Sequence, residues 1–242
     1  MRMTVNLEFL GSVYRAAGAV SAWVFPCRCL VCTEPGQHRR DLCGPCAAGL
    51  PRMPVACPHC ALRLPADADA GQPCGRCQRR RPPLQLAAAA FVYGAPVDGL
   101  LRRFKFHQDL AAGRLLAELM CQPMATLPQP DALVPVPLHW ARLRRRGYDQ
   151  ALELARPLAT ALQLPLCQGL RRVRATAPQS ELDAAARRRN LKAAFVAKGP
   201  LPQHVALVDD VMTTGATLHA AAIALRRAGV QRVDAWVCAR VP

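Results

Sequence analysis

Short apolar runs alternate with longer stretches in which Ala and Leu mix with Arg. Residues 205–208 are all apolar and half of them are β-branched, whereas residues 218–228 combine Ala, Leu and Arg. The first pattern is typical of a strand buried on both faces of a parallel sheet, and the second favours a helix. Residues 87–93, 132–136 and 230–241 are further strand candidates, and residues 140–164 are a further helix candidate. This alternation predicts an α/β domain with a mostly parallel sheet.

The first 26 residues carry a weaker helical pattern. Apolar side chains recur near helical spacing at Leu7, Leu10, Tyr14, Ala17 and Val24, which predicts an amphipathic helix over residues 1–26. Glu8 and Arg15 interrupt this stretch before it reaches the length of a signal-peptide core. With no run of 18 apolar residues in the chain, we expect no membrane span and a cytoplasmic protein.

Eight cysteines between the first helix and the first strand form four C-x-x-C pairs. These pairs are Cys29/Cys32, Cys43/Cys46, Cys57/Cys60 and Cys74/Cys77. The two-residue spacing lets a tight turn present both sulfurs to one tetrahedral ion, so four pairs predict two structural Zn²⁺ sites. Disulfides would require an oxidising compartment, and thioredoxin-like redox chemistry requires a single pair.

The spacing alone leaves consecutive, nested and interleaved pairings open. We favour consecutive pairing, in which the first pair joins the second and the third joins the fourth, because it closes the shortest loops. Cys27 and His59 are expected to be bystanders. The Arg and Pro residues at 79–83 indicate a domain boundary, so residues 27–83 form a predicted double zinc ribbon and residues 84–242 the α/β domain.

An acidic pair and a loop of small residues separate the strand at 205–208 from the helix that follows. Asp209 and Asp210 come first, and Thr213, Thr214, Gly215, Ala216 and Thr217 lead into the helix. The first turn of a helix has unpaired N–H groups and a positive dipole end, which together favour an anion such as phosphate. Carboxylates accept hydrogen bonds from sugar hydroxyls, so the pattern suits a ribose that carries a 5′-phosphate. Neither a G-x-x-x-x-G-K-[ST] nor a G-x-G-x-x-G motif occurs, which argues against nucleoside triphosphates and dinucleotides.

Basic residues dominate the charged composition. Lys and Arg number 32 against 16 Asp and Glu, a formal net charge of +16, and this excess predicts an anionic partner. Arg102, Arg103, Phe104 and Lys105 mix cations with an aromatic ring, as single-stranded nucleic acid sites do. The alternative is an amphipathic helix whose Phe104 and Phe106 both pack inward. Arg142, Arg144 and Arg145 follow another predicted strand, at the rim where α/β sheets bind ligands, although each could belong to a solvated helix start.

Several motifs together resemble a known family. The sequence V-D-D-V-M-T-T-G-A-T resembles the phosphoribosyl pyrophosphate (PRPP) loop of type I phosphoribosyltransferases. With V-P-V-P-L-H, R-R-G-Y-D-Q-A-L-E-L-A, T-A-P-Q-S-x-L and R-R-x-N-x-x-x-A-F, all behind a double zinc ribbon, the order and spacing are similar to the ComF family from about Cys29 onward. One departure is Asp149, where the family pattern carries Asn, and an ionised carboxylate only accepts hydrogen bonds.

The resemblance implies a phosphoribosyltransferase-like, Rossmann-like domain that binds PRPP with Mg²⁺. It implies that the PRPP loop comprises Asp209, Asp210, Val211, Met212, Thr213, Thr214, Gly215, Ala216 and Thr217, and that Arg142, Arg144 and Arg145 face the pyrophosphate. A hood over the ligand would carry Gln179, Arg187, Arg188, Arg189 and Asn190.

Two functions are compatible with these residues. The first, which the ComF resemblance implies, is a PRPP-binding protein that handles single-stranded DNA during natural transformation, with DNA-uptake or helicase machinery as partners. The second is a Mg²⁺-dependent transferase that moves ribose 5-phosphate from PRPP to a nitrogenous acceptor, for which the sequence identifies no acceptor pocket and no certain catalytic residue.

Overall fold

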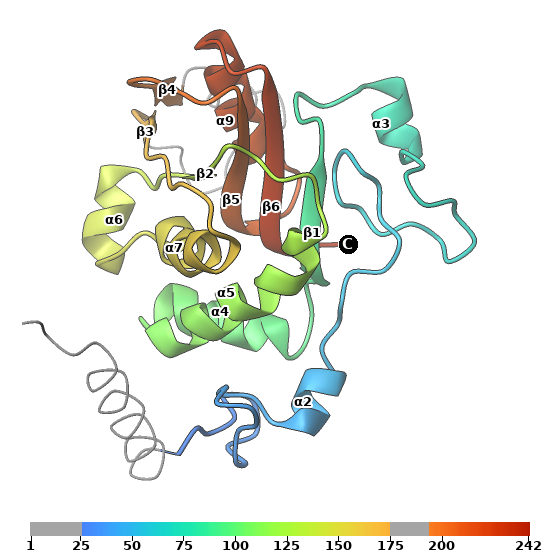
Figure 1. The fold of residues 1–242 in the computed structure, drawn as a ribbon, viewed down its shortest axis with the longest axis vertical. Coiled ribbons are helices and arrows are strands. Elements are labelled where there is room, and N and C mark those ends of the chain that lie inside the picture. Colours follow the sequence, from blue (N-terminus) through green and yellow to red (C-terminus); the bar gives the residue numbers. More distant parts are fainter. Residues whose placement is uncertain (1–25, 175–193) are drawn as a thin grey trace, which may run out of the picture. The chain divides into compact units, whose positions relative to one another are not determined.

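The computed structural model describes residues 26–174 and 194–242 (Figure 1). The chain divides into two compact units, one ending at Gly49 and the other comprising Leu50–Pro242. The second pair of cysteine motifs therefore belongs to the same unit as the sheet. Nearly all of the predicted helix at residues 1–26 lies outside the described residues, as do the predicted hood residues Gln179, Arg187, Arg188, Arg189 and Asn190.

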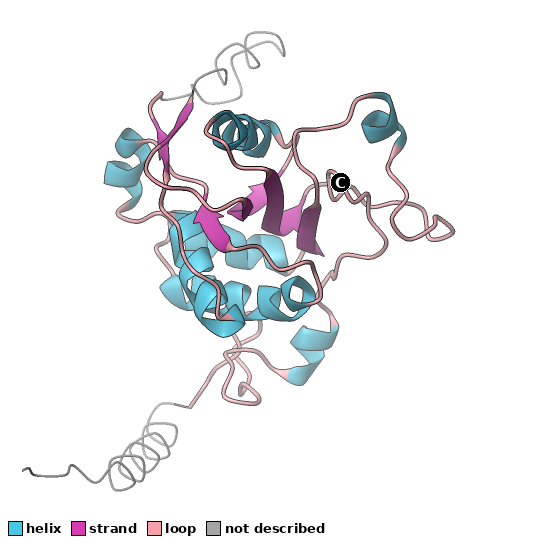
Figure 2. Ribbon diagram, turned by 45° about the horizontal axis from the view of Figure 1, so that its top comes forward, coloured by secondary structure: helices cyan, strands magenta, loops and turns pink. Residues whose placement is uncertain are grey.

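The larger unit contains a four-stranded parallel sheet, as the alternating pattern predicts. Its strands are β1 (Ala87–Val92), β6 (Arg232–Arg240), β5 (His204–Met212) and β2 (Ala132–Pro135), in that order across the sheet. Helices α4 (Val97–Phe106), α5 (Leu110–Ala125) and α7 (Gln150–Leu162) cover one face, and α9 (Ala216–Arg227) lies on the other (Figures 1 and 2). A short antiparallel ladder joins β3 (Leu170–Arg172) to β4 (Phe195–Ala197).

Two elements differ in extent from the sequence-based prediction. The acidic pair was expected beyond the end of its strand, but β5 continues through Asp209 and Asp210 because β6 pairs with it as far as Met212. The predicted helix at 140–164 is two helices, α6 (Trp140–Arg146) and α7. The break occurs at Gly147, whose φ of 82° is left-handed and ends α6.

The second cysteine group is anchored to the sheet by backbone contacts. The Ala87 N–H donates to the Pro58 carbonyl at 2.7 Å, and the Met53 N–H donates to the Ala90 carbonyl at 3.0 Å. Ala61, next to the ligand Cys60, is buried in the hydrophobic cluster that also contains Leu218 of α9. The second cysteine group, the sheet and the helix after the predicted phosphate loop therefore share one core.

The smaller unit has little regular structure between Pro26 and Gly49. Its helix α2 (Gly44–Ala48) starts directly after Cys43, and Arg28 forms an isolated antiparallel bridge with Pro35. In the larger unit, α3 (Gly75–Arg79) likewise starts directly after Cys74. In the part of the chain that is described, no helix combines the length and the apolar character needed to cross a membrane.

Candidate functional site

The sheet splits at the carboxyl end of β2, and the split makes room for a ligand. β2 pairs with β5 only as far as Pro135, opposite Val208, whereas β5 runs four residues further. The last bond of this ladder runs from the Val136 N–H to the Val208 carbonyl at 2.9 Å. The Leu138 N–H donates instead to Asp149 Oδ2 at 3.0 Å, which turns the chain away from β5.

A cavity of about 490 Å³ lies at this end of the sheet. Its lining residues come from the strand ends, from β3 and from the helices α4, α6 and α7: Tyr93, Leu101, Arg102, Lys105, Phe106, Val136, Pro137, Leu138, Arg142, Arg146, Gln150, Ala151, Arg172, Asp209, Asp210, Val211, Thr213, Thr217 and Val241. The structure thus brings Arg142, the acidic pair and both ends of the predicted phosphate loop to one cavity.

The predicted phosphate loop connects β5 to α9. Gly215 is the N-cap of α9 and has a φ of 77°, a conformation that L side chains rarely adopt. A Cβ at this position would lie 2.6 Å from Met212 Cε, so the loop folds back tightly on the end of its own strand. The first-turn N–H groups and the positive dipole end of this 12-residue helix follow directly, as an anion site requires.

Asp209 and Asp210 are held in different ways. Asp210 is 6% exposed and pairs with Lys105, whose Nζ lies 2.6 Å from Oδ2. Asp209 Oδ1 accepts the Asp210 N–H at 2.9 Å. Burial and the neighbouring Asp210 carboxylate raise the pKa of Asp209 to about 8. One carboxyl of the pair is therefore neutralised by a lysine, and the other by a proton over much of the physiological pH range.

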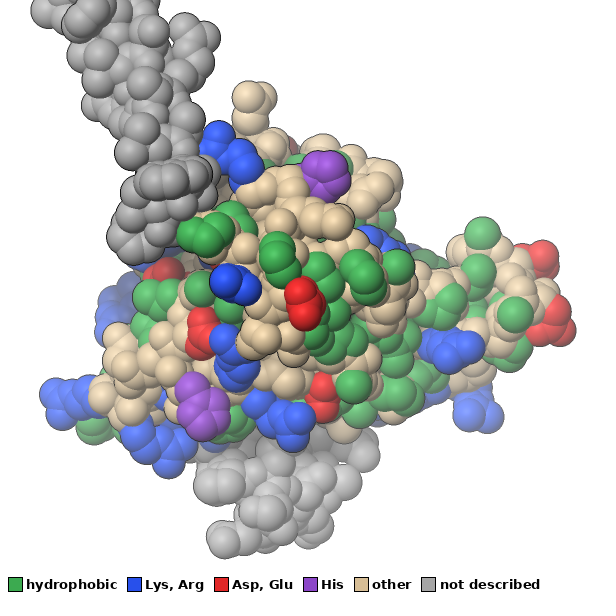
Figure 3. All heavy atoms as spheres, turned by 90° about the horizontal axis from the view of Figure 1, so that it is seen from below, with side chains coloured by type: hydrophobic (Ala, Val, Ile, Leu, Met, Phe, Trp, Pro, Cys, Tyr) green, Lys and Arg blue, Asp and Glu red, His purple; other side chains and the backbone are tan. Residues whose placement is uncertain are grey.

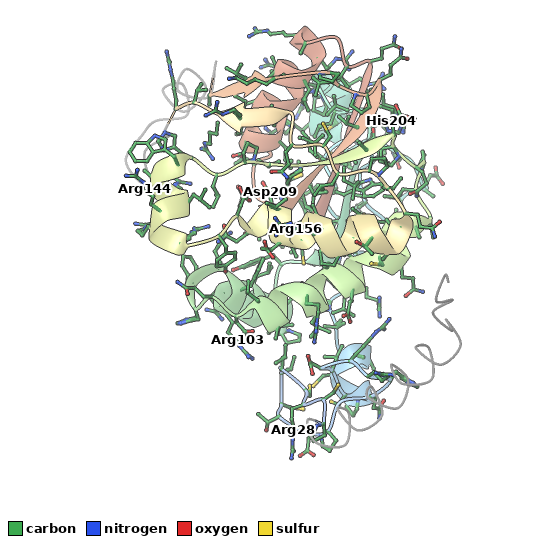
Figure 4. All side chains as sticks on the ribbon, turned by 60° about the vertical axis from the view of Figure 1, so that its left-hand side comes forward. Arg28, Arg103, Arg144, Arg156, His204 and Asp209 are labelled. Carbon is green, nitrogen blue, oxygen red and sulfur yellow. The ribbon has the colours of Figure 1, made fainter. Side chains whose placement is uncertain are left out.

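Four of the described arginines line the cavity, and two of them were among the candidates from sequence. Arg102 was a nucleic-acid candidate and Arg142 a pyrophosphate candidate, whereas Arg146 and Arg172 were not predicted. Arg146 Nη1 donates to Gln150 Oε1 at 2.9 Å, and burial lowers the pKa of both Arg146 and Arg172. Arg144 lies on the side of α6 away from Asp209 and places its guanidinium 5.0 Å from the centre of the Trp140 ring (Figure 4).

The residues of the predicted basic and aromatic cluster on α4 lie in different environments. Phe104 is fully buried and packs 5.5 Å from the Tyr148 ring, so it is not available for stacking on a base. Phe106, which was expected to pack inward with it, is 64% exposed. Arg102 and Lys105 line the cavity, whereas Arg103 pairs with Asp109 at 2.6 Å.

The eight C-x-x-C cysteines form two groups, and the consecutive pairing is confirmed. One group is Cys29, Cys32, Cys43 and Cys46, and the other is Cys57, Cys60, Cys74 and Cys77; within each group the sulfurs lie within 4.8 Å of one another. Four thiolates at this separation match tetrahedral zinc and leave no open coordination position. His59 is outside the second group, and its Nδ1 lies 3.0 Å from the Gln85 carbonyl oxygen.

Comparison with known proteins agrees with this organisation. Residues 20–78 match the double zinc ribbon domain and residues 149–242 match the phosphoribosyl transferase domain. DNA utilization protein YhgH of Salmonella typhi is 38% identical over 224 residues, which cover 89% of this chain and 97% of that protein. Competence protein F of Haemophilus influenzae is 36% identical over 229 residues, which cover 89% of this chain and 98% of that protein. The chain belongs to the ComF family.

The solved structure of orotate phosphoribosyltransferase from Aeropyrum pernix aligns less closely with this chain. It is 22% identical, with a TM-score of 0.33, and the alignment covers 54% of this chain and 60% of that one. The ComF assignment does not depend on this alignment.

Asp149, where the ComF resemblance led us to expect Asn, has a structural role. Asp149 is the N-cap of α7, where Oδ1 accepts the Leu152 N–H at 3.3 Å and Oδ2 accepts the Leu138 N–H. Both oxygens act as acceptors, which an ionised carboxylate allows. Burial raises the pKa of Asp149, whereas these backbone donors lower it. The side chain therefore fixes the helix start and the split in the sheet.

Gln150 and Arg172 are site residues that sequence reasoning missed in this ComF protein. Gln150 is 2% exposed and lines the cavity from the first turn of α7. Arg172 reaches the cavity from β3, where its guanidinium lies 5.4 Å from the Phe195 ring centre. The burial of Gln150 is visible only in the structure, although the motif R-R-G-Y-D-Q that contains it stands out in the sequence. Arg172 has no comparable signal.

Proposed function

We propose that this protein binds PRPP together with Mg²⁺ in the cavity at the carboxyl end of the sheet. The observation that carries the proposal is the convergence of Asp209, Asp210, Thr213, Thr217 and Arg142 on one cavity, although they come from two separate segments of the chain. In this arrangement the carboxyls accept the ribose hydroxyls and the start of α9 holds the 5′-phosphate.

The cations that line the cavity suit the pyrophosphate. Arg142, Arg146 and Arg172 line the cavity together with the acidic pair, so a ligand with an anionic group at each end of a sugar meets matching charge. Mg²⁺ prefers carboxylate oxygens and substrate phosphates, and the acidic pair offers such oxygens. When bound, the ion would neutralise the pyrophosphate charge beside Asp209 and Asp210.

Calorimetric titration of PRPP with Mg²⁺ into the zinc-loaded protein tests this proposal. We expect one site per chain with a dissociation constant between about 1 µM and 1 mM. Ribose 5-phosphate and pyrophosphate, titrated separately, are expected to bind more weakly because each reaches only one end of the cavity. The absence of heat with PRPP at millimolar concentration, with or without Mg²⁺, would overturn the proposal.

We further propose that the protein acts in the cytoplasm on single-stranded DNA during DNA uptake. Relatives that span nearly the whole chain are named competence protein F and DNA utilization protein. On the face in Figure 3, Lys and Arg side chains are scattered among hydrophobic and polar ones, so charge alone does not outline a binding surface on that face. Intact four-thiolate sites fit a reducing compartment.

Exposed aromatic rings beside arginines locate a stronger candidate surface on α6 and at the end of α4. Trp140 is 59% exposed beneath Arg144, and Phe106 is 64% exposed with the Arg146 guanidinium 5.6 Å from its ring centre. Exposed aromatic faces accept nucleic acid bases, and the arginines meet the phosphates.

Single-strand affinity should decrease when the rings are removed. Because stacking contributes about 1–3 kcal/mol per base, Trp140→Ala and Phe106→Ala are each expected to weaken binding of a fluorescent single-stranded oligonucleotide by about fivefold or more. Ile223→Ala, at a 42% exposed apolar side chain on α9, is the matched control. Binding should also fall steeply with added salt. Equal affinity of all three variants, or affinity that ignores salt, would contradict this surface.

A further inference from the structure

Arg240 connects the second cysteine group to the strand that carries the phosphate loop. It is the last residue of β6 and is only 7% exposed. Its Nε donates to the carbonyl oxygen of Cys60 at 2.9 Å, and its Nη1 donates to the carbonyl oxygen of Met212 at 3.3 Å. The same Nη1 contacts the Val241 carbonyl. One buried cation thus holds backbone groups from three parts of the chain.

Both ends of this bridge are functional positions. Cys60 is one of the four sulfur ligands of the second zinc site. Met212 directly precedes the loop at residues 213–217, and its side chain is packed so closely against Gly215 that a Cβ there would lie 2.6 Å from Cε. The contacts therefore run without a gap from a zinc ligand, through one guanidinium, to the N-cap of α9.

The surrounding packing makes the bridge rigid. Cys60, Ala61, Met212 and Leu218 belong to one hydrophobic cluster. Burial lowers the pKa of Arg240, and the nearby thiolates of Cys60, Cys74 and Cys57 oppose that effect. A buried arginine needs carbonyl and anionic partners on every side. If the ribbon came apart, Arg240 would lose the Cys60 carbonyl and keep only partners at the end of the sheet.

We propose that Arg240 is a positioning residue that makes the second zinc site a support for the phosphate loop, so that zinc at this site and PRPP in the cavity bind cooperatively. The PRPP half of this statement rests on the proposed function. Linkage requires the effect to be reciprocal: loss of the metal weakens PRPP binding, and PRPP tightens the metal by the same factor.

Equilibrium competition with a zinc chelator measures this linkage in the full-length protein. The measured quantity is the chelator concentration that removes one zinc equivalent. With Mg²⁺ present, we expect saturating PRPP to raise this concentration by about fivefold or more. Arg240→Lys should abolish the shift, because a lysine keeps the charge but lacks the planar fork that reaches both carbonyls. Arg232→Lys is the matched control, since Arg232 lies at the other end of β6 and pairs with Asp234 at 3.0 Å. A shift that survives in Arg240→Lys would overturn the proposal.

Amide hydrogen exchange provides a readout that needs no PRPP. Removing zinc from the wild-type protein is expected to speed exchange at residues 213–217 by about fivefold or more, while exchange in α5 stays unchanged. Zinc-loaded Arg240→Lys should show the fast exchange already, with far-ultraviolet circular dichroism confirming that it is folded. If the wild-type protein binds no PRPP, the proposed function fails and the exchange result alone decides the role of Arg240. Unchanged exchange after zinc removal would refute that role.

Discussion

The double variant Asp209→Asn, Asp210→Asn is expected to bind PRPP with Mg²⁺ at least about 100-fold more weakly than the wild-type protein. Hydrogen bonds to a charged acceptor contribute about 1.5–3 kcal/mol each, so the loss of two corresponds to a factor of about 10² to 10⁴. Among the described residues that line the cavity, the substitutions also remove the only carboxylates, and with them the oxygens that a magnesium ion prefers.

Calorimetry at pH 8 gives the clearest comparison, because Asp209 is ionised in a large share of the molecules there. Glu153→Gln is a suitable control: Glu153 lies on α7 in a surface pair with Arg156, at 2.8 Å, and is not among the cavity-lining residues. It should bind PRPP as tightly as the wild type. Undiminished affinity in the double variant would show that the acidic pair does not hold the ligand.

Asp209→Asn alone is expected to make the unliganded protein more stable at pH 8, by about 1–2 kcal/mol in the free energy of unfolding. The folded protein retains a proton on Asp209 up to about pH 8, whereas the unfolded chain releases it near pH 4. Between these values the unfolded state binds fewer protons, so this carboxyl lowers stability as the pH rises. Asparagine has no proton to release and can still accept the Asp210 N–H.

Thermal unfolding at pH 5 and pH 8 tests this sign. The midpoint of Asp209→Asn should exceed that of the wild type by about 2–8 °C at pH 8, and the difference should be much smaller at pH 5. Asp210→Asn is the contrasting variant, because it leaves Lys105 without the carboxylate that lies 2.6 Å away, and it should be less stable than the wild type. A larger gain for Asp209→Asn at pH 5 than at pH 8 would contradict the assignment.

Local sequence patterns were sufficient for much of the fold and part of the site. The strand before Asp209, the helix after Gly215 and the consecutive pairing of the cysteine motifs depend on neighbouring residues and short loops, and all three are confirmed. The role of the acidic pair in holding a ribose stays a prediction, as does that of Gln179, Arg188 and Asn190, which lie outside the described residues.

The missed features depend on residues that are distant in sequence. The length of β5 is set by its pairing with β6, and the partner of Asp210 is a lysine more than a hundred positions earlier. The two phenylalanines of α4 are a different case, because residues two positions apart on a helix face different sides, so that Phe106 is exposed while Phe104 is buried. Their separation follows from the local spacing, whereas nothing in the local pattern around Lys105 specifies its partner.

The position of Asp149 has an evolutionary consequence. Its two oxygens serve two N–H groups on different segments, one before α6 and one in the first turn of α7. An asparagine at this position offers a single acceptor oxygen, so a lineage that exchanges the two residues must provide another acceptor for Leu138 or for Leu152. Aspartate and asparagine are nearly equal in size, but they differ in the number of oxygens that accept hydrogen bonds. We therefore expect it to co-vary with neighbouring residues around the split in the sheet rather than to occur alone.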